Sequence, residues 1–265
     1  MAASLTDLCV PQRQGDAFRL DVPAGWQQGR GAFGGFTIGA LIRAIEQRIA
    51  DPSRKVRSVT AELPAPVETG AAEITVEVLR TGNNLSAARA ALVQGNETRA
   101  HAVAILAATR PGAGPLAWRD LAPPEAPPWK SLAPTPLHEG APEFTHNFEY
   151  TVVEGLPFGS GAPARAVGWV RPKIPCGLRD VGYIASMIDV WWPAAFTKFP
   201  PTRPCATITF TLEVVAGLDG LNPDAPLLYR GTVPVCQDGY FFETRELWGE
   251  DGRLVAINHQ TFAVI

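Results

Sequence analysis

One organisational plan occurs twice in this sequence, and it restricts the possible folds more than any other feature. Apolar side chains recur every three to four residues at about 36–49 and at about 180–193, which predicts two helices. Alternating apolar and polar residues predict four strands after the first helix, at 57–63, 72–80, 86–94 and 98–107. The same pattern predicts four strands after the second helix, at 206–215, 227–235, 240–248 and 254–264. Helices combined with antiparallel strands joined by short turns indicate an α+β fold built from two similar halves.

The two halves are separated by a segment of different composition. Residues 111–142 are rich in proline, alanine and glycine and show no periodicity, which is typical of a linker that lies on the surface. We therefore expect an N-terminal domain at 1–110 and a C-terminal domain at 143–265. Further short strands are predicted before the two helices, at 18–22, 144–153 and 164–171.

Composition argues against several classes of protein. The 265 residues carry a formal net charge of −3, so the chain has no electrostatic footprint for nucleic acid or for an anionic membrane. The start of the sequence lacks the basic region of a secretory signal, and no apolar run is long enough to span a bilayer. The four cysteines and four histidines are scattered, which argues against a metal site. We expect a cytoplasmic protein with reduced cysteines.

A single charged residue, Asp189, lies inside the second apolar segment. It is flanked by Ile188, Val190, Trp191 and Trp192. An ionised carboxylate in such surroundings costs free energy unless it is hydrogen-bonded, so Asp189 has either a structural partner or a catalytic role. Burial would favour its neutral form and raise its pKa, which would suit a general base that works at neutral pH.

Four glycines, at positions 29, 31, 34 and 35, precede the first helix or lie in its first turn. They allow the backbone to approach another group closely, and that group is either a neighbouring sheet or a ligand. They do not form a phosphate-binding loop, because the Gly-Lys-Ser/Thr ending is missing.

Several short motifs occur in a fixed order along the chain. In the first half they are Phe33–Gly34–Gly35 at the start of the helix, and residues 79–89, which are similar to a hairpin of the form L-R-x-G-x-S-x-S-x-R. In the second half they are residues 183–186 leading to Asp189, residues 206–208, and residues 254–256 followed by Gln260. In this order and spacing the motifs resemble the acyl-CoA thioesterase II (TesB-like) family over essentially the whole chain.

This resemblance implies both a fold and a reaction. The fold is a double hotdog, in which each of two tandem repeats wraps an antiparallel sheet around a long helix. The implied activity is that of a thioester hydrolase of lipid metabolism, which splits acyl-CoA into a free acid and CoA and needs no cofactor. The resemblance also implies a homodimer or a larger homo-oligomer.

The active site of that family holds a water against the thioester carbonyl with an Asp, a Thr and a Gln. Carried over by motif, these residues are Asp189 as the base, Thr207 to orient the water, and Gln260 to hold it through its side-chain amide. Thr209 and Thr211 are predicted on the same face of the strand as Thr207, so the choice of hydroxyl stays open. The first half has apolar residues at the corresponding positions, with Ile105 or Leu106 near the counterpart of Gln260, which predicts one site per chain.

The expected substrate contacts are the backbone of Gly34 and Gly35 and the side chains of Trp191 and Trp192. These tryptophans, with Phe196 and Phe199, would shorten an acyl tunnel; an aromatic cluster of this kind is equally a part of a core or a subunit contact. The sequence departs from the family at two strand ends, 62–70 and 213–217, where the motifs H-x-x-F-x-R-P-G and F-x-R-P are replaced. These departures concern how the acyl group or CoA is held.

Two other functions stay open. A protein that has lost turnover through its altered strand ends would bind acyl-CoA without hydrolysing it. An enoyl-CoA hydratase of the same fold would carry a D-x-N-x-x-H motif, and this sequence lacks one.

Overall fold

The computed structural model describes residues 3–110, 117–158, 163–200 and 203–265. Two helices pack against each other, α2 (Gly34–Ile49) and the shorter α3 (Val181–Asp189), and a short helix α1 (Leu5–Leu8) lies near the N-terminus. The strands of the large sheet are β1 (Gln12–Gln14), β2 (Ala17–Val22), β5 (Lys55–Glu62), β6 (Gly70–Thr81), β7 (Leu85–Gln94), β8 (Glu97–Ala107), β9 (Phe148–Glu154), β10 (Arg165–Pro172), β11 (Cys205–Val214), β12 (Leu227–Gln237), β13 (Tyr240–Trp248) and β14 (Leu254–Val264). The short strands β3 (Gln27–Gln28) and β4 (Gly31–Ala32) form a separate hairpin.

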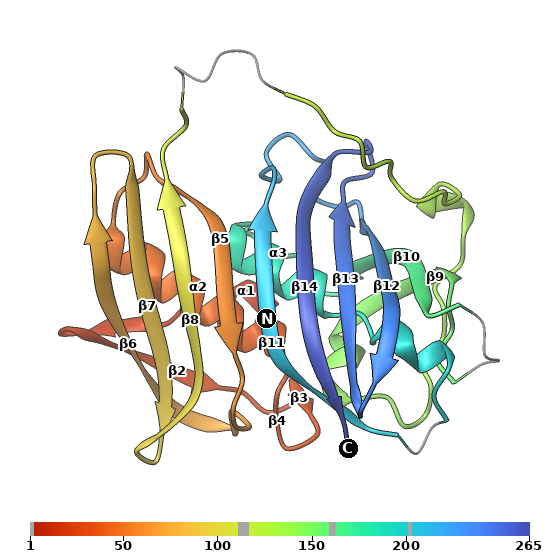
Figure 1. The fold of residues 1–265 in the computed structure, drawn as a ribbon, viewed down its shortest axis with the longest axis horizontal. Helices are drawn as coiled ribbons and strands as arrows, with labels where there is room; N and C mark the ends of the chain where they lie inside the picture. The colour runs from red at the N-terminus through yellow and green to blue at the C-terminus, as the bar shows by residue number, and fades with distance from the viewer. Residues whose placement is uncertain (1–2, 111–116, 159–162, 201–202) are drawn as a thin grey trace.

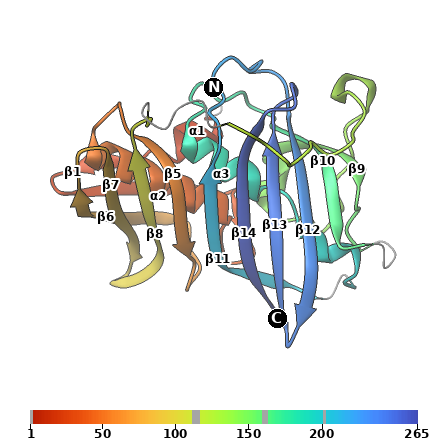
Figure 2. The same cartoon turned by 45° about the horizontal axis from the view of Figure 1, so that its top comes forward.

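The large sheet is continuous across both halves of the chain. Its order is β1-β2-β6-β7-β8-β5-β11-β14-β13-β12-β10-β9, so β5 and β11 join the two halves at its centre. The helices α2 and α3 lie behind this central part of the sheet in the view of Figure 1, and Figure 2 shows the same arrangement from a tilted direction. The junction of the two halves is therefore the place where two central strands and two helices come together.

The two halves have the same strand order. From the outer edge to the centre the first half runs β2-β6-β7-β8-β5, and the second half runs β10-β12-β13-β14-β11. The predicted four strands after each helix are confirmed, and the bounds predicted for β13 and β14 are those observed. The sheet also includes β2 and β10, which come before the helices in the sequence.

Two predicted elements have different bounds in the structure. The helix predicted to about residue 193 ends at Asp189. Pro193 disfavours the helical conformation of Trp192 before it, and its ring would clash with the carbonyl of Asp189 in a continued helix. The strand predicted from residue 144 begins at Phe148, and Glu143–Asn147 is a 3₁₀ helix that follows Pro142. In this turn Phe144 packs on Phe33 with ring centroids 4.5 Å apart, so it enters the core instead of the sheet.

The helices α2 and α3 approach each other through small residues. A Cβ on Gly39 would lie 2.9 Å from the carbonyl oxygen of Gly182 and 3.0 Å from the hydroxyl of Ser186. At the far end of this contact Arg43 donates two hydrogen bonds of 2.8 Å to Asp180. In the sequence the apolar stripe of this helix is Ile38, Leu41, Ile42, Ile45 and Ile49, which predicts that Arg43 lies outside it; this prediction is wrong, because Arg43 is 3% exposed. Its partner is an N-cap residue of the other helix, 137 positions away.

The described part of the linker lies on the second half of the sheet. The indole of Trp129 donates to Glu250 in the turn between β13 and β14, and the indole of Trp169 on β10 donates to the carbonyl of Pro127. Trp118 is exposed. In Figure 1 this segment runs along the top and right of the molecule. No helix among the described residues is long and apolar enough to cross a membrane.

Candidate active site

The C-terminal end of α3 meets the N-terminal end of α2, and Asp189 lies at this meeting point. A Cβ on Gly34 would be 2.8 Å from Oδ2 of Asp189, and a Cβ on Gly35 would be 2.8 Å from Cα of Ser186. Neither position can hold a larger residue without movement of the helices or of the carboxylate. Gly31 has a different role, since its Cβ would lie 2.9 Å from the backbone nitrogen of Val67. Gly34 and Gly35 thus allow α2 to lie close to α3 and to the carboxylate of Asp189.

A bulge in β11 decides which threonine faces the site. The register with β14 pairs Thr207 with Phe262, Thr209 with Thr261 and Phe210 with Gln260, so Ile208 is the extra residue. Side chains alternate between faces on either side of a bulge, and the bulge changes their phase.

Thr207 therefore shares the inner face with the buried side chain of Phe210. Thr209 and Thr211 lie on the opposite face, where the hydroxyl of Thr211 donates to the backbone carbonyl of His259. The prediction that all three threonines share one face is wrong, because the sequence does not reveal the bulge.

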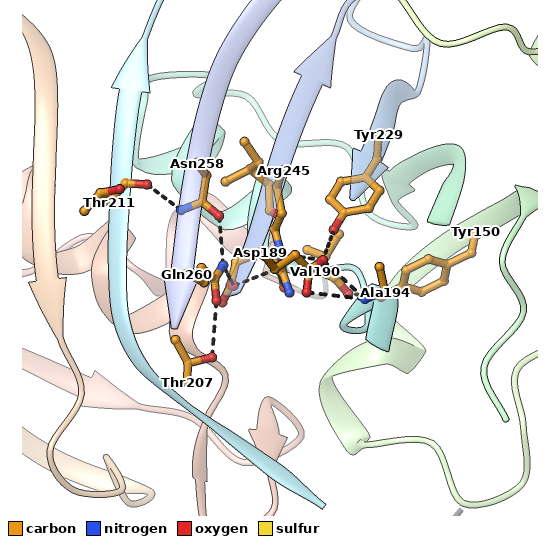
Figure 3. A network of polar contacts seen from close by, with 12 residues as sticks. Tyr150, Asp189, Val190, Ala194, Thr207, Thr211, Tyr229, Arg245, Asn258 and Gln260 are labelled. Carbon is orange, nitrogen blue, oxygen red and sulfur yellow. Dashed lines mark hydrogen bonds and ion pairs between the residues drawn. The ribbon is translucent and has the colours of Figure 1, made fainter. Parts of the chain in front are cut away.

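Gln260 joins Asp189 to Thr207. Its Nε2 donates to Oδ1 of Asp189 at 2.7 Å, and its Oε1 is 3.3 Å from the hydroxyl of Thr207 (Figure 3). The second hydrogen of Nε2 goes to Oδ1 of Asn258 at 2.9 Å, and Nδ2 of Asn258 in turn donates to the carbonyl of Thr211 at 2.6 Å. Because each amide nitrogen faces an acceptor, this chain fixes which way the Gln260 amide points. The structure brings the three predicted residues together.

A buried charged pair that the sequence reasoning missed lies beside them on β13. Nη1 of Arg245 donates to Oδ1 of Asp189 at 3.0 Å, and its Nε donates to Oε1 of Glu243 at 3.2 Å. Glu243 also accepts from the hydroxyl of Tyr229 at 3.0 Å and from the backbone N–H of Ala194 at 3.3 Å. The signal was available, because both charged residues are in phase with the apolar residues of a strand whose inner face is buried.

Burial sets the proton affinity of this site. It raises the pKa of Asp189 above the ordinary value, although the charge of Arg245, the amide of Gln260 and the backbone of Gly35 act in the opposite direction. Burial likewise raises the pKa of Glu243, against the charge of Arg245. A carboxylate with a raised pKa, held by donors on Oδ1 and with Oδ2 beside a glycine, is suited to take a proton from a small molecule at Oδ2.

The two tryptophans lie next to the site in sequence but belong to an aromatic cluster. Trp191 is 2% exposed and stacks on Tyr229 with centroids 5.0 Å apart, and Trp192 is half-buried and packs on Tyr150 and Trp191. Their expected contact with a substrate stays a prediction. Among the described residues no group of three or more His, Cys, Asp or Glu side chains is arranged to hold a metal ion.

Comparison with known families gives two matches that together cover most of the chain. The model of the acyl-CoA thioesterase N-terminal domain matches residues 22–109, and the model of the acyl-CoA thioesterase C-terminal domain matches residues 119–264. A comparison with curated proteins finds no match.

Solved structures with a similar fold cover the whole length. A protein of unknown function with a hotdog fold from Alicyclobacillus acidocaldarius has a TM-score of 0.88 at 21% identity, over 100% of this chain and 99% of the other. The TesB protein of Mycobacterium avium subsp. paratuberculosis has a TM-score of 0.80 at 17% identity, over 98% of both chains. Acyl-CoA thioesterase II TesB2 from Mycobacterium marinum has a TM-score of 0.76 at 19% identity, over 98% of this chain and 96% of the other. The fold is thus of the hotdog type.

Proposed function

Since the chain belongs to the acyl-CoA thioesterase family, we propose that it hydrolyses acyl-CoA to a free acid and CoA at one site made by Asp189, Thr207 and Gln260. The observation that carries this proposal is the position of the Gln260 side chain, whose Nε2 donates to Asp189 at 2.7 Å while its Oε1 lies 3.3 Å from the hydroxyl of Thr207. A base, a hydroxyl and a neutral amide in one connected group are what the activation of a water requires.

In the proposed reaction Thr207 and Asp189 hold the attacking water between them. The hydroxyl of Thr207 donates a hydrogen bond to Oε1 of Gln260, so its lone pairs are available to accept a hydrogen bond from the water. Oδ2 of Asp189 accepts the other hydrogen, because the side-chain donors that reach this carboxylate, from Gln260 and Arg245, both end on Oδ1. The oxygen of the water then points its free electron pair at the thioester carbon.

In the chemical step Asp189 takes one proton from the water and later gives it to the leaving sulfur. The water oxygen bonds to the carbonyl carbon, Asp189 takes the proton, and the carbonyl oxygen becomes an oxyanion. When the C–S bond breaks, the CoA sulfur leaves with the electron pair and receives the proton from Asp189. The products are the carboxylic acid and CoA, and Asp189 returns to its ionised state.

We propose that the N-terminal turn of α2 is the substrate-binding contact of Gly34 and Gly35: the N–H of Gly34 donates to the oxyanion, while the backbone of Gly35 hydrogen-bonds the carboxylate of Asp189 and holds it beside the substrate. The first N–H groups of a helix have no acceptor within the helix, and the helix dipole favours negative charge there. A crystal structure with an acyl-CoA analogue tests this assignment: a carbonyl oxygen far from Gly34 and Gly35 would refute it.

The finer features of the architecture are proposed on the same basis. The matching strand orders of the two halves support a double hotdog. Buried alanines that occupy the first half at the register of Glu243, Arg245, Asn258 and Gln260 support one site per chain. A homodimer or larger homo-oligomer follows by analogy with the family, and sedimentation of the purified chain tests it.

The first experiment is thiol release from short, long and aryl acyl-CoAs by the wild type and by Asp189→Asn. The substitution keeps the shape of the side chain but removes its basicity, so we expect kcat to fall by about 10²–10⁴-fold. Binding of acyl-CoA without thiol release by the wild type would show instead a non-catalytic acyl-CoA-binding protein. Formation of hydroxyacyl-CoA with the thioester intact would show a hydratase.

A further inference from the structure

We propose that Arg245 and Glu243 are positioning residues of this site: Arg245 holds Asp189 as the ionised base, and Glu243 competes for the same guanidinium. This inference rests on the proposed function, because it assigns Asp189 as the base. It goes beyond the catalytic trio, since neither residue is part of it and neither is needed to hold the water or the thioester.

Arg245 is placed to act on Asp189 and not on a substrate. Its side chain is 1% exposed, and Nη1 reaches both Oδ1 of Asp189 at 3.0 Å and the carbonyl oxygen of Ile188 at 3.3 Å. The guanidinium also lies over the ring of Phe262, 5.4 Å from its centroid. A planar cation fixed by α3 and β14 gives Asp189 a defined orientation as well as a counter-charge.

Glu243 holds the other edge of the same guanidinium. Its carboxylate accepts from Nε of Arg245 and is anchored by Tyr229 on β12 and by the backbone of Ala194. A Cβ on Gly231 would lie 2.7 Å from Oε1 of Glu243. The second buried carboxylate thus faces a glycine just as Asp189 faces Gly34. In both cases a Cβ at the glycine would occupy the space of the carboxylate oxygen.

The charges of the cluster do not balance when both acids are ionised. Two carboxylates whose side chains are 8% and 0% exposed share one guanidinium, and separating an unpaired charge from water is costly. The other titratable groups that face them are neutral, because burial raises the pKa of Tyr229 on β12 and raises the pKa of Cys205 on β11 to about 12. The helix α2 contributes backbone N–H groups and no titratable side chain at this end.

The proton affinity of Asp189 is therefore coupled to both residues, with opposite signs. Removing the positive charge of Arg245 leaves Asp189 buried without its counter-charge, which favours the protonated acid. Removing the negative charge of Glu243 leaves Arg245 to Asp189 alone, which favours the ionised base.

The test is the pH profile of kcat/KM together with a carboxyl ¹³C NMR titration of Asp189, assigned by its loss in Asp189→Asn. In Arg245→Met we expect the acidic limb and the Asp189 titration to move up by about one to three pH units. In Glu243→Gln, which keeps an acceptor for Nε, we expect both to move down. Arg245→Lys restores the charge and is expected to return the limb towards the wild-type position. Because neither residue touches the substrate, KM is expected to stay within about threefold.

Two controls separate positioning from stability. Arg245→Met with Glu243→Gln removes the pair together, so it leaves fewer unpaired buried charges and remains folded if Arg245→Met alone does not. It too is expected to move the limb up. Arg43→Met breaks the ion pair between α2 and α3 at the far end of α3, so it should lower stability without moving the limb.

The outcomes distinguish this inference from the proposed function. An unchanged Asp189 titration in both Arg245→Met and the double variant, or shifts of the same sign in Arg245→Met and Glu243→Gln, overturns the inference even if the enzyme is active. Absence of thiol release by the wild type overturns the proposed function, whereas the NMR titration still reports whether Arg245 and Glu243 control Asp189.

Discussion

Substitution of Gly34 by alanine tests whether the meeting of the two helices matters for activity. The new Cβ would lie 2.8 Å from Oδ2 of Asp189 and 3.2 Å from Cδ1 of Leu63. An ordinary van der Waals contact begins at 3.4 Å, so the carboxylate must move by a few tenths of an ångström or more. Misplacement of a catalytic group by about 1 Å costs about 10²-fold in rate, and we therefore expect kcat to fall by about 10–10²-fold.

The same substitution is not expected to destabilise the fold. Gly34 does not have a positive φ, and alanine is favoured over glycine in a helix by up to about 1 kcal/mol. The matched control is Gly39→Ala in the same helix, whose Cβ would meet backbone of α3 at 2.9 Å and so is expected to cost about 1–3 kcal/mol of stability. Thiol release and thermal melting measure the two effects. Wild-type kcat in a folded Gly34→Ala protein would refute the assignment of Oδ2 as the proton acceptor.

Two further predictions concern β11 and the outer end of α2. Thr207→Val is expected to lower kcat/KM by about 10²-fold, whereas Thr209→Val, on the outer face, should stay within about twofold; equal losses in thiol release would contradict the bulge. Glu46, whose pKa burial raises to about 7, holds a proton in the folded state that it loses in the unfolded state above its ordinary value of 4.5. Its stabilising effect is therefore present below pH 4.5 and is lost as pH rises to about 7. In Glu46→Gln the free energy of unfolding measured with urea should lose this fall with pH, which amounts to at most about 3 kcal/mol in the wild type. An unchanged slope would contradict this pKa.

The sequence predicted the bounds of those elements whose ends are set by neighbouring residues. The strands β13 and β14 are separated from each other and from β12 by glycine-containing turns, so their ends could be located to the residue. The end of α3 and the start of β9 could not, because a proline and a buried aromatic side chain override the periodicity there. The burial of Arg43 depends on Asp180, a partner that only the tertiary structure brings close.

The site shows the same limit. Asp189 could be identified from sequence because a carboxylate interrupts an apolar helix, and Thr207 and Gln260 only through the resemblance to a family. The inner face of Thr207 depends on the bulge at Ile208, which no pattern of the strand reveals. Arg245 was missed because a charged residue in a strand is usually taken as solvent-facing, and only the partner carboxylates explain why it is buried.

The register of the two halves supports the proposal of one such site per chain. In the second half Glu243 pairs with Gln260 and Arg245 with Asn258 on the inner face of β13 and β14. In the first half the corresponding inner pairs on β7 and β8 are alanines, Ala88 with Ala104 and Ala90 with Ala102, all fully buried. The register therefore places Ala104 at the counterpart of Gln260, and not the expected Ile105 or Leu106.

A buried polar network is stable only when each member has its partner, and a partly satisfied one costs more than an apolar core. The two arrangements seen here are the two stable extremes. One half retains the complete set of donors and acceptors around Asp189, and the other has small apolar side chains at each equivalent inner position. A single polar substitution among these alanines, such as Ala104→Gln, would therefore be expected to destabilise the first half without creating a second site.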